Sequence, residues 1–364
     1  MTGMATWLSL VMKDAFALVG MSAYLALLVD VPGKPTAVAL IAGFTVLNVV
    51  GAKTTASVQM ALVAFVMVVM GWFLIEGLPH VGSGDGSLDP FFTHGAGGVV
   101  SAIGLVFVSY GGLTKVASIA EEIEDPSRNI PLGMGLSLAV STVLYTLGVL
   151  VAVAVIPPEE LHEDLAPIHT AAEAVMPALG AGLIVAAALA AFASTANAGI
   201  LAAARYPMAM SRDGLMSPSF QQLSRFGTPT RGVLITGAGM AVVVIAFDAG
   251  AIAKLASAFV LLTLGLVNLA VIVLRASQIR SYAPGFRAPL FPYLQVFGIG
   301  LAIYLIVTLG WLAILLVTGT VLLALAWFHR YGRPRANQQA GAIHHNFERL
   351  GRAADHGVER EICL

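Results

Sequence analysis

Long, mainly apolar stretches dominate this sequence and restrict the folds that are open to it. A transmembrane helix needs about 20 consecutive, mainly apolar residues, and ten stretches of the chain approach or exceed that length. Of the 364 residues, 58% are hydrophobic and 11% are charged, whereas soluble domains carry about 25% charged residues. The sequence therefore predicts an all-α, polytopic membrane protein with about ten transmembrane helices. The stretches cover residues 4–30, 36–52, 56–77, 96–120, 132–156, 177–206, 230–247, 251–275, 293–310 and 311–329.

The distribution of basic residues between the loops predicts how these helices are oriented. In membrane proteins the cytoplasmic loops carry an excess of Lys and Arg. If the N-terminus is cytoplasmic, the basic residues of the outer loops are Lys34 and Lys254, and the inner loops and the tail are rich in basic residues. We therefore predict a multi-pass protein of the cytoplasmic membrane with both termini inside. The inner basic residues are Lys53, Arg128, Arg205, Arg212, Arg225, Arg231, Arg275, Arg280, Arg287, Arg330, Arg333 and Arg335.

The chain divides into a transmembrane core, residues 1–330, and a polar cytoplasmic tail, residues 331–364. Apolar residues recur in the tail at the spacing of a helix, which predicts an amphipathic helix. The alternative is a frayed, solvated tail in which this spacing arises by chance. The residues that carry the pattern are Ile343, Phe347, Leu350, Ala354, Val358 and Ile362.

Several functional classes lack the residues that they require. The histidines fall in loops, at the ends of spans or in the tail, and no group of His, Cys and carboxylate residues has the spacing of a metal site. The sequence contains no glycine-rich phosphate loop and no basic patch with interleaved aromatic residues. We therefore expect neither an enzyme nor a nucleic-acid-binding protein, and no cofactor or catalytic residue. The lipid bilayer is an expected partner, and the oligomeric state stays open.

The fourth apolar stretch contains a glycine pair that predicts a break in its helix. Each glycine weakens a helix by roughly 1 kcal/mol relative to alanine, and within a bilayer freed backbone groups are tolerated only where they line a cavity or are covered by protein. Hydroxyl and aromatic side chains flank the pair, so we interpret it as a substrate site whose N–H groups face a bound carboxylate. Close helix packing at small residues is the alternative. The predicted substrate-binding residues are Ser109, Tyr110, Gly111, Gly112, Leu113 and Thr114.

The sixth apolar stretch carries polar side chains that are candidates for binding a cation. Ser194, Thr195 and Asn197 supply hydroxyl and amide oxygens that suit a hard monovalent cation. The alternative is a small-residue face for tight packing, in which Ser and Thr bond to carbonyl groups of their own helix.

Three ionisable residues lie inside spans and away from their ends, where a charge is costly and is by default a candidate for a functional role. Lys115 lies one turn beyond the glycine pair and either meets a carboxylate or mimics a bound cation. Its alternative role is that of a lysine whose ammonium group reaches the inner interface. Lys13 and Asp14 are neighbours in the first stretch, and we interpret them as local polar anchors.

Four motifs, in order along the chain, resemble those of the amino acid–polyamine–organocation permeases. Residues 48–53, NVVGAK, resemble the turn N-x-x-G-x-K of that family. Residues 120–131, AEEIEDPSRNIP, resemble its signature AEE-x-x-(N/D)P-x-R-x-IP. The segment SRDG at 211–214 with TP at 228–229, and RAPLFP at 287–292, resemble two of its inner loops. The chain is thereby identified as similar to these permeases over most of its length.

The resemblance implies a fold similar to that of LeuT-type carriers, with two inverted five-helix repeats followed by two further helices. On this correspondence the fourth stretch is the broken helix that opens the second repeat. Three stretches precede it where the family has five. The resemblance therefore implies an incomplete first repeat, without the two helices that include the GSGIF-like segment and half of the substrate site.

The resemblance also implies a function, namely secondary transport of amino acids or related small amines by alternating access, as symport or antiport. Proton-coupled relatives can carry a lysine in the span after the N-x-x-G-x-K turn, but residues 63–69 contain none. Ser194 and Thr195 correspond roughly to cation ligands of sodium-coupled carriers, so both Na⁺ and H⁺ stay open as coupling ions. The alternative function is that of a truncated, non-transporting membrane protein with a sensor or assembly role.

Overall fold

The described part of the chain is built from helices. The computed structural model describes residues 2–51, 56–82, 95–112, 116, 120, 123–277 and 286–332, and it contains no strand among them. The predicted all-α fold is confirmed. The helices are α1 (Thr2–Ala26), α2 (Gly33–Val49), α3 (Ala56–Gly77), α4 (Gly95–Tyr110), α5 (Pro126–Val155), α6 (Pro158–Glu163), α7 (Pro167–Val175), α8 (Ala178–Arg212), α9 (Thr230–Ala246), α10 (Ala249–Ser277), α11 (Tyr293–Thr308) and α12 (Trp311–Trp327).

Each predicted apolar stretch contains one apolar helix, and the protein is a multi-pass membrane protein. By length and composition α1, α3, α5, α8, α10 and α12 can cross a membrane, whereas α2, α4, α9 and α11 are shorter apolar helices. Two short helices, α6 and α7, occupy a segment that the sequence suggests is an outer loop. The largest difference concerns α4, which ends at Tyr110, well before residue 120 where we expect its span to end. The predicted amphipathic helix of the tail lies outside the described residues.

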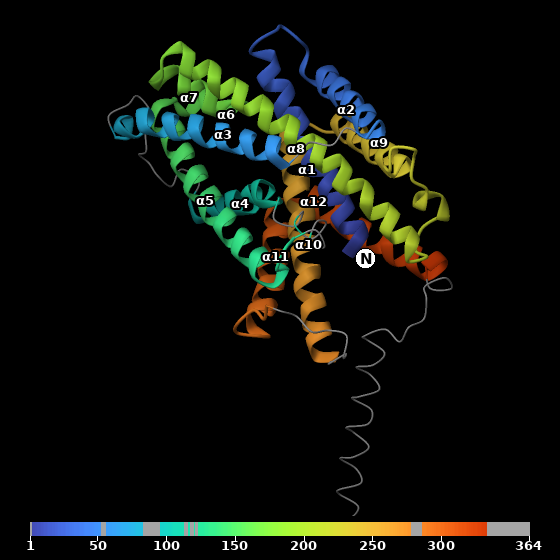
Figure 1. Cartoon of the computed structure of the whole chain (residues 1–364). Helices are drawn as coiled ribbons and strands as arrows, with labels where there is room; N and C mark the ends of the chain where they lie inside the picture. Colours follow the sequence, from blue (N-terminus) through green and yellow to red (C-terminus); the bar gives the residue numbers. More distant parts are fainter. Residues whose placement is uncertain are drawn as a thin grey trace, which may run out of the picture.

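Helix α1 lies at the centre of the molecule. It packs against α8, α10, α2 and α9 (Figure 1), and these helices form the largest cluster of buried apolar side chains. A second cluster joins α3, α5 and α7 to the first part of α8, and a third joins α10 to α11 and α12. Because α8 and α10 each contribute to more than one cluster, these helices connect the parts of the bundle.

Glycines at helix crossings bring backbones into close contact. A Cβ atom at Gly232 of α9 would lie 2.5 Å from the carbonyl oxygen of Ala204 in α8. A Cβ atom at Gly237 of α9 would overlap the side chain of Thr45 in α2. Small residues are typical of helix crossings in membranes, where van der Waals packing rather than the hydrophobic effect associates the helices. Close packing at glycines therefore shapes these two crossings of α9.

The Gly232→Ala variant tests this packing. We expect it to lower the free energy of unfolding by roughly 1–3 kcal/mol, because the added methyl group forces two backbones apart. Thermal unfolding of the detergent-solubilised protein measures the effect. Gly43→Ala in α2 is the matched control, since no atom lies within 4 Å of a Cβ atom at that position. Equal unfolding midpoints for the two variants would contradict the close approach of α8 and α9.

Candidate substrate site

Helix α4 ends at the glycine pair, and a serine of α10 bonds to its final turns. The hydroxyl group of Ser257 donates to the carbonyl oxygen of Leu105 at 2.6 Å and accepts from the N–H group of Val108 at 3.0 Å. Ser257 is fully buried, and buried backbone groups need such partners. A side chain that inserts into the backbone ladder distorts a helix. Ser257 therefore holds the end of α4 against α10.

The two glycines make room for a lysine of α1. A Cβ atom at Gly111 would lie 2.9 Å from Cγ2 of Val260 in α10 and 3.3 Å from Cδ of Lys13. A Cβ atom at Gly112 would lie 3.4 Å from Nζ of Lys13. Side chains at positions 111 and 112 would crowd the lysine, so the glycine pair allows Lys13 to run alongside the end of α4.

A pocket of about 330 Å³ lies beside this end of α4, between α1 and α5. The ring of Tyr110 packs edge-on against that of Tyr145 in α5, with 5.6 Å between the ring centres. Its hydroxyl group donates to Oγ1 of Thr142 at 3.3 Å. The described lining offers one ammonium group, several hydroxyl groups and no carboxylate, which suits a ligand with a carboxylate. The lining residues are Lys13, Ser109, Tyr110, Gly112, Val116, Gly133, Met134, Ser137, Leu138, Ser141 and Tyr145.

Of the residues predicted to bind substrate, Ser109, Tyr110 and Gly112 line this pocket, and Gly111 is buried against its wall. Leu113 and Thr114 lie outside the described residues, as does Lys115 among the coupling candidates. The predicted half-helix after Gly112 falls in the same segment. The assignment of a substrate to these residues stays a prediction.

The cation candidates of α8 bond to neighbouring helices. Ser194 donates to Oε1 of Gln59 in α3 at 2.8 Å. The Oδ1 atom of Asn197 accepts a hydrogen bond of 3.0 Å from Nδ2 of Asn48 in α2. Thr195 is half-buried between them along α8. These bonds join α8 to α3 and α2, and a role of the three residues in cation binding stays a prediction.

The sequence did not predict three features of the pocket: that Lys13 lines it, that serines of α5 line it, and that Ser257 supports the end of α4. The position of Lys13 inside an apolar span signals function, but its neighbour Asp14 suggested a local pair of polar anchors. Serines are common in membrane helices and carry no signal of their own. The link between Ser257 and α4 joins residues that lie far apart in the sequence.

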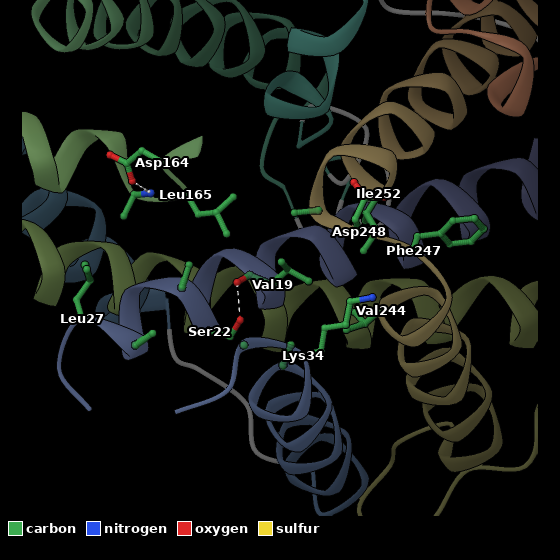
Figure 2. A pocket seen from close by; sticks show the side chains of 16 residues that line it. Val19, Ser22, Leu27, Lys34, Asp164, Leu165, Val244, Phe247, Asp248 and Ile252 are labelled. Atoms are coloured by element: carbon green, nitrogen blue, oxygen red, sulfur yellow. Dashed lines mark hydrogen bonds between the residues drawn. The ribbon is translucent and has the colours of Figure 1, made fainter. Parts of the chain in front are cut away.

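A second, larger pocket of about 500 Å³ lies at the C-terminal end of α1 (Figure 2). Figure 2 shows Asp164 on one side, Asp248 on the other and Ser22 of α1 between them. Asp164 accepts hydrogen bonds from the N–H group of Ala166 at 2.7 Å and from Oγ1 of Thr170 at 2.6 Å, at the start of α7. These bonds give its carboxylate a structural role in the loop.

Asp248 has a similar role at the start of α10. Its Oδ2 atom accepts a hydrogen bond of 3.2 Å from the N–H group of Ala251. This bond, with smaller contributions from other backbone N–H groups and from the charge of Lys34, holds the pKa of the Asp248 carboxyl below its usual value. The ionised form of Asp248 therefore stabilises the N-terminus of α10.

The residues that the structure describes contain no candidate set of metal ligands. None of their His, Cys, Asp and Glu side chains form groups of three or more that could hold a metal ion. The features that emerge are a bundle of apolar helices and a polar pocket at the end of one of them, α4. They define an integral membrane protein with a polar pocket beside the end of α4. The chain belongs to the amino acid permease family, which matches residues 1–329.

Curated relatives of the chain carry different names. The chain is 30% identical over 260 residues to the methylthioribose transporter of Bacillus subtilis. The matched region covers 71% of this chain and 56% of that protein. It is 31% identical to the vacuolar cationic amino acid transporter 4 of Arabidopsis thaliana, over 70% of this chain and 42% of that protein. It is 30% identical to a branched-chain amino acid permease of B. subtilis, over 67% of this chain and 52% of that protein. The matches thus span about half the length of these relatives.

Replacement of Ser257 tests the support of α4. We expect Ser257→Ala to loosen the last turns of α4, because the N–H group of Val108 and the carbonyl group of Leu105 each lose a hydrogen bond to α10, at about 0.5–1.5 kcal/mol per bond. Hydrogen exchange of residues 104–112 should become faster. Thr263→Val is the matched control, since the buried Thr263 hydroxyl bonds to Phe259 within its own helix. Unchanged exchange in Ser257→Ala would contradict this role.

The lowered pKa of Asp248 predicts a pH dependence. A carboxyl whose pKa is lower in the folded state contributes stability above its unfolded value of about 3.9, and this stability is lost as the pH falls through the folded pKa. We therefore expect Asp248→Ala to lower the unfolding midpoint at neutral pH and to have less effect in acid. Asp30→Ala, which removes an exposed carboxylate after the end of α1, is the control. An effect of Asp248→Ala that is independent of pH would contradict this account.

Proposed function

We propose that this protein is a secondary transporter that carries amino acids or related small zwitterions across the cytoplasmic membrane by alternating access. The pocket beside the interrupted end of α4 carries this proposal, because carriers of this type bind their substrates at broken helices near the midplane. Membership of the amino acid permease family supports the same function. The basic inner loops support an orientation with both termini in the cytoplasm.

Lys13 is the residue that we propose binds the substrate carboxylate. Its ammonium group lies next to Gly112 and lines the pocket. A hydrogen bond between charged groups is short and about twice as strong as a neutral one. The hydroxyl groups of Ser137 and Ser141 on the facing side of the pocket belong to α5, and they offer partners for the amino group of the substrate.

Tyr110 links the pocket to a movement that alternating access requires. The tyrosine ends α4 and contacts α5 through its ring and its hydroxyl group. Gly111 and Gly112 directly follow it and give the chain freedom to change its direction. A substrate bound between Lys13 and Tyr110 would therefore draw the end of α4 toward α1 and close the pocket.

Uptake by proteoliposomes tests the proposed function. We expect the purified chain to accumulate at least one radiolabelled compound from a panel of neutral, acidic and cationic amino acids and methylthioribose. Exchange of external labelled substrate for internal unlabelled substrate is the second measurement, since it requires no ion gradient. Neither uptake nor exchange for any compound would contradict the proposal. If methylthioribose were the one compound transported, the transport function would stand, but Lys13 would not bind a substrate carboxylate.

Gly112→Leu tests the position of the site. The leucine side chain would enter the space between Lys13 and the pocket, so we expect binding and exchange to be lost. Gly43→Leu is the matched control, because a Cβ atom at Gly43 meets open space. Normal exchange by Gly112→Leu, with expression equal to that of the control, would remove the glycine pair from the site.

Lys13→Met tests the carboxylate contact. Removing a hydrogen bond to a charged group costs about 1.5–3 kcal/mol, so we expect the apparent affinity for substrate to fall by about 10- to 100-fold. Substrate methyl esters, which lack the charge, should lose their disadvantage in this variant. An unchanged preference for the free acid over the ester would contradict the contact.

A further inference from the structure

Three methionines and two aromatic residues line an apolar pocket, the methionine pocket, at the end of the molecule where α1 begins. The start of α1 and the last turns of α8 and α12 meet there (Figure 1). The pocket has a volume of about 170 Å³, and the described residues that line it include no charged side chain. It therefore suits an apolar occupant. Its walls include Met4, Met210, Leu215, Met216, Trp327 and Phe328.

Contacts between the three helix ends hold the walls of the methionine pocket in place. Nε1 of Trp327 donates a hydrogen bond of 2.9 Å to the carbonyl oxygen of Leu215, which joins α12 to the loop after α8. A Cβ atom at Gly3 of α1 would lie 3.3 Å from Sδ of Met210 in α8, so these two helices are also in close contact. Because the indole N–H group already has a partner within the wall, the pocket offers an occupant mainly apolar contact.

The volume and the chemistry of the methionine pocket fit a phenyl ring. A protein cavity of about 150 Å³ with apolar walls binds benzene, and this pocket has about 170 Å³. Methionine sulfur atoms make favourable contacts with aromatic rings, and methionines are frequent on surfaces that bind varied apolar partners. The methionine pocket therefore favours an aromatic side chain as its occupant.

The polar tail of this chain contains one such side chain. Phe347 is the one Phe, Trp or Tyr residue among residues 333–364. Ile343, Phe347 and Leu350 are spaced by four and three residues, which is the spacing of side chains that anchor a helix in an apolar groove. These three residues lie outside the described part of the chain, and the amphipathic helix that includes them stays a prediction.

The tail begins close to the methionine pocket and is long enough to reach it. Phe328 lines the pocket and lies four residues before Gly332, the last described residue. Phe347 follows Gly332 by fifteen residues, and a chain of that length can span up to about 50 Å. A segment that is tethered beside its site has an effective concentration in the millimolar range. A contact of low intrinsic affinity is therefore sufficient for binding.

We propose that the tail of this chain docks at this end of the molecule by inserting Phe347 into the methionine pocket. The docked ring contacts α1, α8 and α12 together and thereby opposes their separation. In a carrier that works by alternating access, this contact slows the opening of that end of the bundle. The effect on opening rests on the proposed transport function, whereas the docking of Phe347 does not.

The rate of thiol labelling measures whether Phe347 occupies the pocket. Cys363 is the one cysteine of the chain, so Cys363→Ser followed by Met216→Cys places a single thiol in the pocket wall. The full-length protein is held in lipid nanodiscs with one copy per disc. We expect Phe347→Ala to raise the rate of reaction with a maleimide about tenfold, the factor for a pocket that is occupied about nine-tenths of the time.

His345→Ala is the matched control for the labelling experiment. It also removes a ring from the tail, but on a helix position 345 is rotated by about 200° from position 347. We expect labelling in this variant to stay slow. Fast labelling of His345→Ala would overturn the proposal, because protection would then not depend on the face that carries Phe347.

A synthetic peptide of residues 343–364 identifies the occupant directly. Added to the full-length Phe347→Ala protein, the peptide should restore slow labelling, and the same peptide with alanine in place of Phe347 should not. Equal labelling rates with Phe347 and with Phe347→Ala would overturn the proposal, and a tail helix that lies on the bilayer surface gives this result. If Met216→Cys does not fold, Met4→Cys places the thiol in another wall, and equal rates there overturn the proposal as well.

Substrate exchange by proteoliposomes separates docking from its effect on transport. If opening requires an empty pocket, Phe347→Ala should exchange substrate up to about tenfold faster than the native protein, and His345→Ala should exchange at the native rate. Docking of Phe347 with an unchanged exchange rate in Phe347→Ala would overturn the restraint on opening. If none of these proteins shows uptake or exchange, the proposed transport function fails, and the labelling rates still decide whether Phe347 docks.

Discussion

The close contact between α1 and α8 is the interaction on which the rest of the bundle depends. The two helices fit together in both directions. Gly199 of α8 receives the side chain of Asp14, and a Cβ atom at Gly20 of α1 would lie 2.8 Å from the ring of Phe192 in α8. In a bilayer the hydrophobic effect does little to associate helices, because lipid tails are as apolar as the side chains. Close van der Waals packing of this kind therefore holds helices together. The helices that surround this pair pack against the surface that it forms.

The helices themselves could be predicted because a bilayer leaves few alternatives to a long apolar helix. The positions of their neighbours could not, since helices that are apolar on all sides show no face that marks the interior. Two local features also escaped the sequence. The end of α4 depends on Ser257 of α10, and α7 begins where Asp164 bonds to Ala166 and Thr170. The bonds of Ser257 join residues about 150 positions apart and arise only when the chain is folded.

The glycine pair indicated where the pocket lies. Glycines weaken a helix, and backbone groups freed within a membrane are tolerated only where they line a cavity or are covered by protein. The pocket wall opposite could not be found in this way. Lys13 lies far from the glycines in the sequence, and its neighbour Asp14 made the two charges look like one polar anchor. The structure separates them, since Lys13 lines the pocket and Asp14 is buried against α8. Although the two residues are neighbours in the sequence, they point in different directions from the helix axis and therefore have different surroundings.

Helix α8 has a mechanical consequence for the molecule. It contains 35 residues and its internal proline, Pro207, lies near its C-terminal end, so most of its length, about 50 Å in all, is uninterrupted. The helix meets α1 at Gly199 and continues to the cluster that holds α7. A tilt of α8 about the crossing at Gly199 would act as a lever and swing α7 through a larger arc. The position of α7 would thereby report a change of contact deep within the bundle.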